Sequence, residues 1–159
     1  YGEDFATNVL GIPPHRIVNM SNFVGHVLKE VQRIGFTRVL MVGHMGKFVK
    51  VAGGIFSTHS KDSDARMEII MANLALLGAP VELLEKVDQC ITTDAAGTLI
   101  EEYHYEEVYQ VLVDKMKFRS ERLLRNRKPE VSIDVVTFGT EVGYLASTQT
   151  LEEIAEEWT

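Results

Sequence analysis

The feature that most constrains the fold is an unbroken apolar stretch, Val39–Val42, that runs into a glycine-containing turn. A strand that is apolar at every position, not at alternate ones, is typical of a sheet covered on both faces. A helix is expected directly after the turn, from about Gly46 to Ala52. A covered strand followed at once by a helix favours an α/β fold over an open antiparallel sheet.

The remaining apolar periodicity extends this pattern along the chain. Further strands are predicted at Arg16–Met20 and Ile133–Phe138, the latter followed by a loop that contains Gly139 and Gly143. Helices are predicted at 2–10, 22–34, 64–77, 81–87, 94–103 and 105–125, with a last helix at the carboxyl end. We therefore expect an α/β domain with a mostly parallel sheet and helices on both faces, a Rossmann-like three-layer arrangement. Three or four strands are few for such a sheet, which suggests an incomplete fragment.

Polar residues before the predicted helices give their expected starting points. Ser21 is placed to cap the helix at 22–34, and Ser63 or Asp62 the helix at 64–77. Thr93 is the expected cap of the helix at 94–103. Thr150 and Glu153 have the spacing of a capping box for the last helix.

Composition restricts the class of protein. A chain of 159 residues with 45% hydrophobic and 25% charged residues is typical of one globular domain, here 1–159. The net charge of −7 argues against nucleic-acid binding, although Lys115–Lys128 is a basic run. The single cysteine, Cys90, fits a reducing cytoplasm, and no apolar run is long enough for a membrane span.

The turn after the first buried strand is the strongest candidate for a ligand site. Gly43, Gly46 and Lys47 lie where a strand gives way to a helix, and free amides at a helix start favour an anion. In open α/β sheets, ligands bind outside the carboxyl ends of the strands. The spacing is neither a P-loop nor Gly-x-Gly-x-x-Gly. A tight turn that closes a helix onto the sheet is an equally good explanation.

A second polar loop, Thr58-His59-Ser60, follows within a dozen residues. His59 and His44 could each donate to a carboxylate or act as a base, whereas a structural hydrogen bond is the commoner role of a loop histidine. The planar guanidinium group of Arg66 is suited to donating two hydrogen bonds to one carboxylate. No protein metal site is expected, because ligand-spaced Cys or His partners are missing.

Several segments together resemble one family. They are Tyr1–Phe5, Met20–Gly25, Val39–Lys47, Lys50–Ser60, Asp64–Glu68 and Thr92-Thr93. In this order and spacing they are similar to the carboxyl-terminal half of the CbiD family, the cobalt-precorrin-5B C(1)-methyltransferases of anaerobic cobalamin biosynthesis. The resemblance runs from Tyr1 to about Thr93, and the run from Gly43 to Ser60 is its most specific part.

The resemblance implies transfer of a methyl group from S-adenosylmethionine to ring carbon 1 of a corrinoid that brings its own cobalt. It further implies an amino-terminal half as partner, and it leaves self-association open. His59 and His44 are the expected catalytic residues. The residues expected to bind the cofactor are Gly43, Gly46, Lys47, Thr92 and Thr93. Those expected to bind the substrate are Lys50, Thr58, Ser60 and Arg66. Two alternatives stay open: a nucleotide- or anion-binding enzyme domain, and a non-catalytic ligand-binding or oligomerising module.

Overall fold

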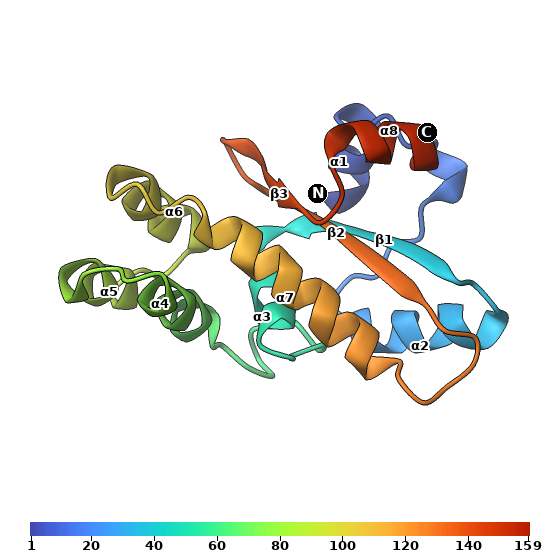
Figure 1. The fold of residues 1–159 in the computed structure, drawn as a ribbon, viewed down its shortest axis with the longest axis horizontal. Helices are drawn as coiled ribbons and strands as arrows, with labels where there is room; N and C mark the ends of the chain where they lie inside the picture. The colour runs from blue at the N-terminus through green and yellow to red at the C-terminus, as the bar shows by residue number, and fades with distance from the viewer.

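A three-stranded sheet forms the centre of the computed structural model, which describes all 159 residues (Figure 1). The strands are β1 (Arg38–His44), β2 (Ser132–Gly139) and β3 (Gly143–Ser147), in the order β1-β2-β3. The helices are α1 (Gly2–Asn8), α2 (Val24–Ile34), α3 (Met45–Ala52), α4 (Arg66–Leu76), α5 (Val81–Asp88), α6 (Thr93–Glu102), α7 (Val108–Leu123) and α8 (Leu151–Trp158), with a 3₁₀ turn at Pro14–Arg16. The predicted α/β class is confirmed.

The sheet is mixed, so the expectation of a mostly parallel sheet was wrong. β1 and β2 are parallel, with His44 opposite Phe138, whereas β2 and β3 are antiparallel. β3 occupies part of the segment that the sequence assigned to a loop. Gly143 adopts a φ of +74°, which a glycine reaches without strain, and the chain there turns back on β2. The resulting strand is short and begins at a glycine, so it leaves little apolar periodicity in the sequence.

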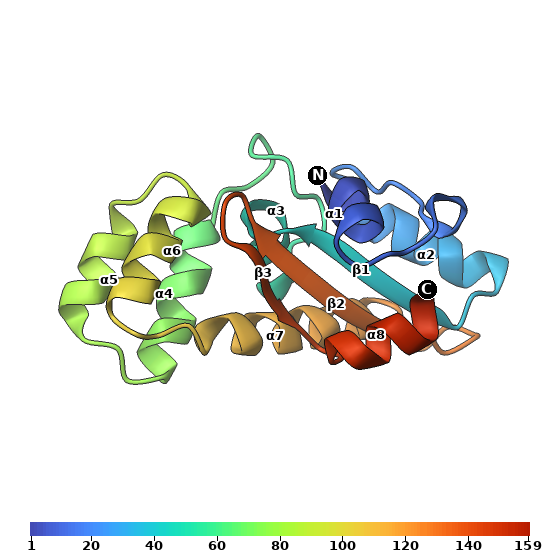
Figure 2. The ribbon, with the colours of Figure 1, turned by 90° about the horizontal axis from the view of Figure 1, so that it is seen from above.

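Helices pack on both faces of the small sheet (Figures 1 and 2), but three strands in mixed directions do not make a clear Rossmann-like three-layer arrangement. On one face, Met41 of β1 and Val135 of β2 pack against α3 and α7. On the other, Val136 and Phe138 of β2 pack against α1 and α8. Successive residues of a strand point to opposite faces, so one apolar run in β2 serves both cores.

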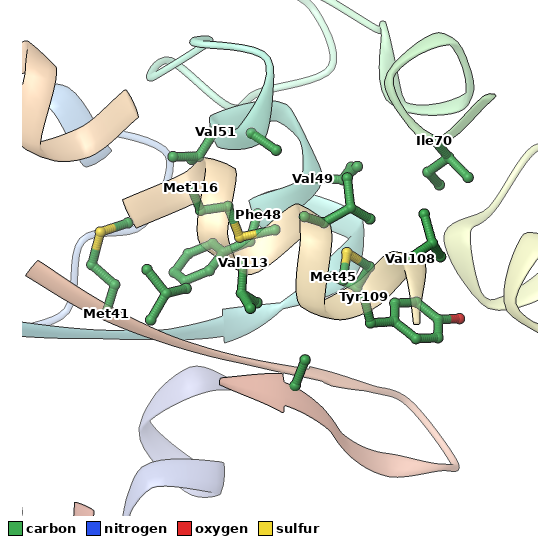
Figure 3. Packing of buried hydrophobic residues seen from close by; sticks show 14 of the residues in the cluster. Met41, Met45, Phe48, Val49, Val51, Ile70, Val108, Tyr109, Val113 and Met116 are labelled. Carbon is green, nitrogen blue, oxygen red and sulfur yellow. The ribbon is translucent and has the colours of Figure 1, made fainter. Parts of the chain in front are cut away.

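The larger core lies between α3, α7 and the sheet. Met41, Phe48, Val113 and Met116 meet there, all at most 2% exposed (Figure 3). Helices α4, α5 and α6 form a group beside it, on the side away from α2 in both ribbon views. This packing fixes α3 directly behind the carboxyl end of β1.

Two local predictions were wrong for related reasons. Arg16–Met20 is not a strand, because Pro13 and Pro14 lead into a 3₁₀ turn that ends at Arg16, and the segment pairs with no strand of the sheet. Ser21 does not cap α2; it has a φ of +49°, and the helix begins at Val24 without a side-chain cap.

Of the other predicted helix caps, only the last is confirmed. α4 begins at Arg66 with Ala65 before it, so neither Ser63 nor Asp62 is its cap. Thr92, and not Thr93, caps α6 by accepting from the amide of Ala95. The capping box of Thr150 and Glu153 at the start of α8 is confirmed. No helix in the structure combines the length and the apolar character needed to cross a membrane.

Candidate active site at the carboxyl edge of the sheet

Polar residues gather where the two parallel strands end. Since β1 and β2 run in the same direction and in register, the turn after His44 lies beside the turn after Gly139. The side chain of Thr137 reinforces this alignment by donating to the carbonyl of Gly43 at 3.0 Å. The start of α6 also lies at this edge, because the carboxylate of Asp94 accepts the amide of Thr140 at 3.1 Å.

His44 joins these three segments through both of its ring nitrogens. Nδ1 accepts the backbone amide of Gly46 at 2.9 Å, which caps α3. Nε2 lies 2.9 Å from the hydroxyl oxygen of Thr140, and that hydroxyl donates to Asp94 at 2.8 Å. Because the single hydroxyl proton of Thr140 goes to the carboxylate, Nε2 must carry a proton and donate to Thr140. The hydrogen bonds therefore define a neutral imidazole that is protonated on Nε2.

Asp94 is the only carboxylate of this network. Partial burial would raise the pKa of Asp94, but the hydrogen bonds from the amide and hydroxyl of Thr140 outweigh that effect and hold the pKa below its ordinary value of 3.8. The carboxylate is thus kept ionised at the end of the hydrogen-bonded chain. It lies in the first turn of α6, where the helix dipole also favours a negative charge.

Gly46 and Thr93 bring the starts of α3 and α6 together. A β-carbon built on Gly46 would lie 3.3 Å from Oγ1 of Thr93 and 3.0 Å from Nδ1 of His44. Thr93 as a whole is only 6% exposed, and its hydroxyl oxygen makes no hydrogen bond within the chain but is not fully covered, so it can be reached from solvent. An open hydrogen-bonding position therefore exists beside two helix amino termini.

Gly43 has a different reason for being glycine. A β-carbon there would lie 2.3 Å from the ring of Phe48, which is less than any tolerated contact. Close packing of α3 on β1 accordingly requires a glycine at this position whether or not a ligand binds. The alternative from the sequence, a turn that closes a helix onto the sheet, has a direct structural basis at Gly43.

The second polar loop wraps around Lys50. This lysine is 2% exposed, and its ammonium donates to the carbonyl of Thr58 at 3.1 Å and to that of Ser63 at 2.5 Å. A buried ammonium needs such acceptors, so Lys50 fixes the shape of the loop from within. It lies behind the surface that a ligand would meet.

The tip of this loop is exposed. His59 accepts the amide of Lys61 through Nδ1, at 3.0 Å, which leaves Nε2 free, and Ser60 makes no hydrogen bond. Thr58 is buried and bonded to Asn22 through its amide and its hydroxyl. No hydrogen bond joins His59 to His44, so the two predicted catalytic histidines belong to separate clusters.

Lys47 and Arg66 hold neighbouring segments together. The ammonium of Lys47 donates to the carbonyl of Ser21 at 3.0 Å. Arg66 bonds to Asp64 at 3.0 Å and to the carbonyl of Ile91 at 3.0 Å, just before the cap of α6. Arg66 also lowers the pKa of Asp64, mainly through this hydrogen bond. Both cations lie near the polar loops but already have partners.

Two hollows of the surface lie away from this edge of the sheet. One, of about 840 Å³, is lined by Thr37, Glu121, residues 124–128 and residues 130–132. The other, of about 290 Å³, lies between α3, α4 and α7. No group of three or more His, Cys, Asp or Glu side chains is arranged to hold a metal ion.

Sequence reasoning missed Thr140 and did not assign Asp94 a role. Thr140 directly follows the second parallel strand, so the rule that sites lie at the carboxyl ends of strands could have identified it. Asp94 was visible only as a residue at a helix start. Its contact with Thr140 spans 46 positions, and only the folded chain brings the two together.

The fold and these contacts define an α/β domain that gathers polar residues from three segments at the carboxyl edge of its sheet. Residues 57–149 match the family model described as CbiD, C-terminal domain. The chain therefore belongs to the CbiD family and corresponds to its C-terminal part.

Individual relatives agree over almost the whole chain. The Cobalt-precorrin-5B C(1)-methyltransferase of Listeria welshimeri is 60% identical over 158 residues, which are 99% of this chain and 42% of that protein. Those of Clostridioides difficile and Citrobacter koseri are 42% and 43% identical, over 98% and 99% of the chain, which are 38% and 41% of their own lengths. The chain thus spans about two fifths of these curated relatives. No solved structure matches it.

Proposed function

We propose that this chain is the carboxyl-terminal domain, residues 1–159, of a cobalt-precorrin-5B C(1)-methyltransferase in cobalamin biosynthesis. The proposal rests on family membership and on the names that the relatives carry. The substrate is a corrinoid, and the methyl donor is S-adenosylmethionine. The enzyme works in the cytoplasm, and the remainder of the relatives' length supplies the other part of the site.

The open hydroxyl of Thr93 beside Gly46 is the observation that supports a ligand at this edge. A hydroxyl that has no partner within the chain and can be reached from solvent suits a polar atom of the cofactor, such as a ribose hydroxyl or a carboxylate. The amino termini of α3 and α6 favour the carboxylate of the methionine moiety. The parallel β1-α3 unit, with its ligand at the carboxyl end of the strand, is the Rossmann-like part of the arrangement.

The residues divide by role within this proposal. His44 positions the turn, because both of its ring nitrogens are already engaged by Gly46 and Thr140. His59, with a free Nε2, and Ser60 are the exposed groups that meet the substrate. Lys50 and Arg66 act indirectly, since one shapes the loop and the other anchors α4. A methyl group on a sulfonium is already activated, so the protein contributes chiefly alignment.

A domain exchange tests the proposal. The matched region of the Listeria welshimeri protein is replaced by this chain, which the 60% identity over 158 residues makes feasible. The chimera is incubated with cobalt-precorrin-5B and S-adenosylmethionine, and the product is examined by mass spectrometry. Addition of one methyl group at ring carbon 1 is expected. A chimera that folds and binds neither compound, while the unaltered relative is active, would contradict the proposal.

A further inference from the structure

The carboxylate of Asp94 is an anion without a cationic partner. Its side chain is 46% exposed, and its only basic neighbour within 4 Å is His44, at 3.7 Å, which the hydrogen bonds to Gly46 and Thr140 define as neutral. Thr140 occupies one position on each carboxylate oxygen, through its amide and its hydroxyl. Since a carboxylate can accept about four hydrogen bonds, further positions on Asp94 remain open to a donor from outside the chain.

Hydrogen-bond donors without partners lie next to this carboxylate. The hydroxyl of Thr93 makes no hydrogen bond within the chain and can be reached from solvent, although the residue as a whole is 6% exposed. The backbone amides of Thr93 and Asp94 are the first of α6, and neither donates to any group of the chain. Free donors and an anionic acceptor therefore lie side by side at one helix start.

The imidazole of His44 borders both kinds of group. A β-carbon built on Gly46 would lie 3.0 Å from Nδ1 of His44 and 3.3 Å from Oγ1 of Thr93. The other ring nitrogen, Nε2, lies 3.7 Å from the carboxylate of Asp94. The hydroxyl and the carboxylate thus lie near the two nitrogens of one small ring. A ligand that reaches both must carry an acceptor and a donor only a few bonds apart.

An α-amino acid group has this combination. Its carboxylate accepts hydrogen bonds from hydroxyls and from the free amides of a helix start, and its ammonium pairs with a carboxylate. S-adenosylmethionine carries such a group. The acetate and propionate groups of a corrinoid are anions, which Asp94 would repel. The charges at the start of α6 therefore favour the cofactor over the substrate.

We propose that Asp94 is a specificity-determining residue of the cofactor site, whose carboxylate binds the α-ammonium of the methionine moiety. The Thr93 hydroxyl and the first amides of α6 bind the α-carboxylate of the same moiety. Thr140 is a positioning residue, because its two hydrogen bonds fix the orientation of the Asp94 carboxylate. This inference rests on the proposed function, in which S-adenosylmethionine is the methyl donor.

Calorimetric titration of the Listeria welshimeri chimera with two matched ligands tests the pairing. The ligands are S-adenosylhomocysteine and its deamino analogue, in which hydrogen replaces the α-amino group. The unaltered chimera should bind the deamino analogue about tenfold more weakly, because a hydrogen bond between charged groups is lost. In Asp94→Asn this preference should disappear, since the ammonium then has no anionic partner.

Two control variants separate the charge of Asp94 from its structural role. Glu85→Gln removes an exposed carboxylate of α5 and should keep the preference for S-adenosylhomocysteine. Thr140→Val keeps the charge of Asp94 but removes one of its hydrogen bonds, so the affinities for both ligands should fall together and their ratio should persist. A merely structural role of Asp94 would change both affinities and leave the ratio unchanged.

The possible outcomes distinguish this inference from the proposed function. Equal affinity of the unaltered chimera for the two ligands would overturn the inference alone, and that measurement needs no variant that could misfold. An Asp94→Asn variant that keeps the preference would also overturn it, because Asp94 would then serve the ribose or the fold. An unaltered chimera that binds neither ligand would overturn the proposed function together with this inference.

Discussion

The Nε2 atom of His44 lies 2.9 Å from the hydroxyl oxygen of Thr140, which bonds the turn after β1 directly to the turn after β2. The hydroxyl of Thr140 donates a hydrogen bond to Asp94, so one chain of hydrogen bonds joins three segments that are far apart in the sequence. Both ring nitrogens of His44 are engaged, since Nδ1 accepts the amide of Gly46. Its part in the site is to hold the turn in place.

Removing the hydroxyl of Thr140 should loosen this connection. The substitution Thr140→Val leaves Nε2–H of His44 without its acceptor and Asp94 without one donor. A loss of about 1 kcal/mol in the free energy of unfolding is expected. Urea unfolding measures this change, and Thr140→Ser, which keeps the hydroxyl, should restore most of the stability. Equal stability of the two variants would show that the hydrogen bond contributes nothing.

The pKa of Asp94 should follow its hydrogen bonds. In the folded chain it lies below 3.8, so the contribution of Asp94 to stability is present at neutral pH and is lost as the pH falls below about 4. NMR titration of the carboxyl carbon should give a pKa below 3.8 in the wild type and a higher one in Thr140→Val. A wild-type value at or above 3.8 would contradict the network.

Tyr109 should ionise only in strong alkali. Burial, and then the nearby carboxylates of Asp94, Glu101 and Glu106, raise the pKa of Tyr109 to about 12. A raised pKa means that its contribution to stability is intact below pH 10 and is lost as the pH rises towards 12. Ultraviolet titration of the phenolate should show one late component, which is absent in Tyr109→Phe. Its persistence in that variant would assign the component to another tyrosine.

Lys50, although buried, should stabilise the second polar loop. Lys50→Met keeps the apolar stem but leaves the carbonyls of Thr58 and Ser63 without their donor. We expect a loss of roughly 1–3 kcal/mol in the free energy of unfolding and faster proteolysis within residues 57–63. The matched control, Lys61→Met, removes an exposed ammonium that makes no hydrogen bond and should change neither quantity.

Neighbouring threonines should behave in opposite ways. Thr92→Val removes the cap of α6 and should cost about 1 kcal/mol in unfolding free energy. Thr93→Val removes a hydroxyl that has no partner within the chain, so stability should be unchanged or slightly higher. Urea unfolding of the two variants separates these roles. A large loss of stability in Thr93→Val would mean that its hydroxyl has a structural partner after all.

The strong local signals of the sequence were enough for much of the fold. The apolar run of β1, the long stripe of α7 and the capping box at Thr150 were each predicted within a few residues. β3 was missed because its five residues pair with β2 through the backbone and begin at a glycine, which leaves little periodicity to read.

The site was predictable in part. The carboxyl-end rule placed the turn at Gly43 to Gly46 correctly at the end of β1, since that strand is evident in the sequence. It could not show that Lys50 points inward, because helical spacing alone does not tell which polar residue a loop will cover. Nor could it show that Thr92 caps α6 while the hydroxyl of Thr93 has no partner. A helix start that is predicted one residue too late exchanges the roles of these two threonines.

The most direct test of the site is the kinetics of the Thr93→Val chimera with the Listeria welshimeri protein. The account predicts that KM for S-adenosylmethionine rises about tenfold, equivalent to about 1.4 kcal/mol, while KM for the corrinoid and the unfolding free energy stay unchanged. An unchanged KM for S-adenosylmethionine, or a rise in the corrinoid KM alone, would contradict the assignment of Thr93 and Gly46 to the cofactor.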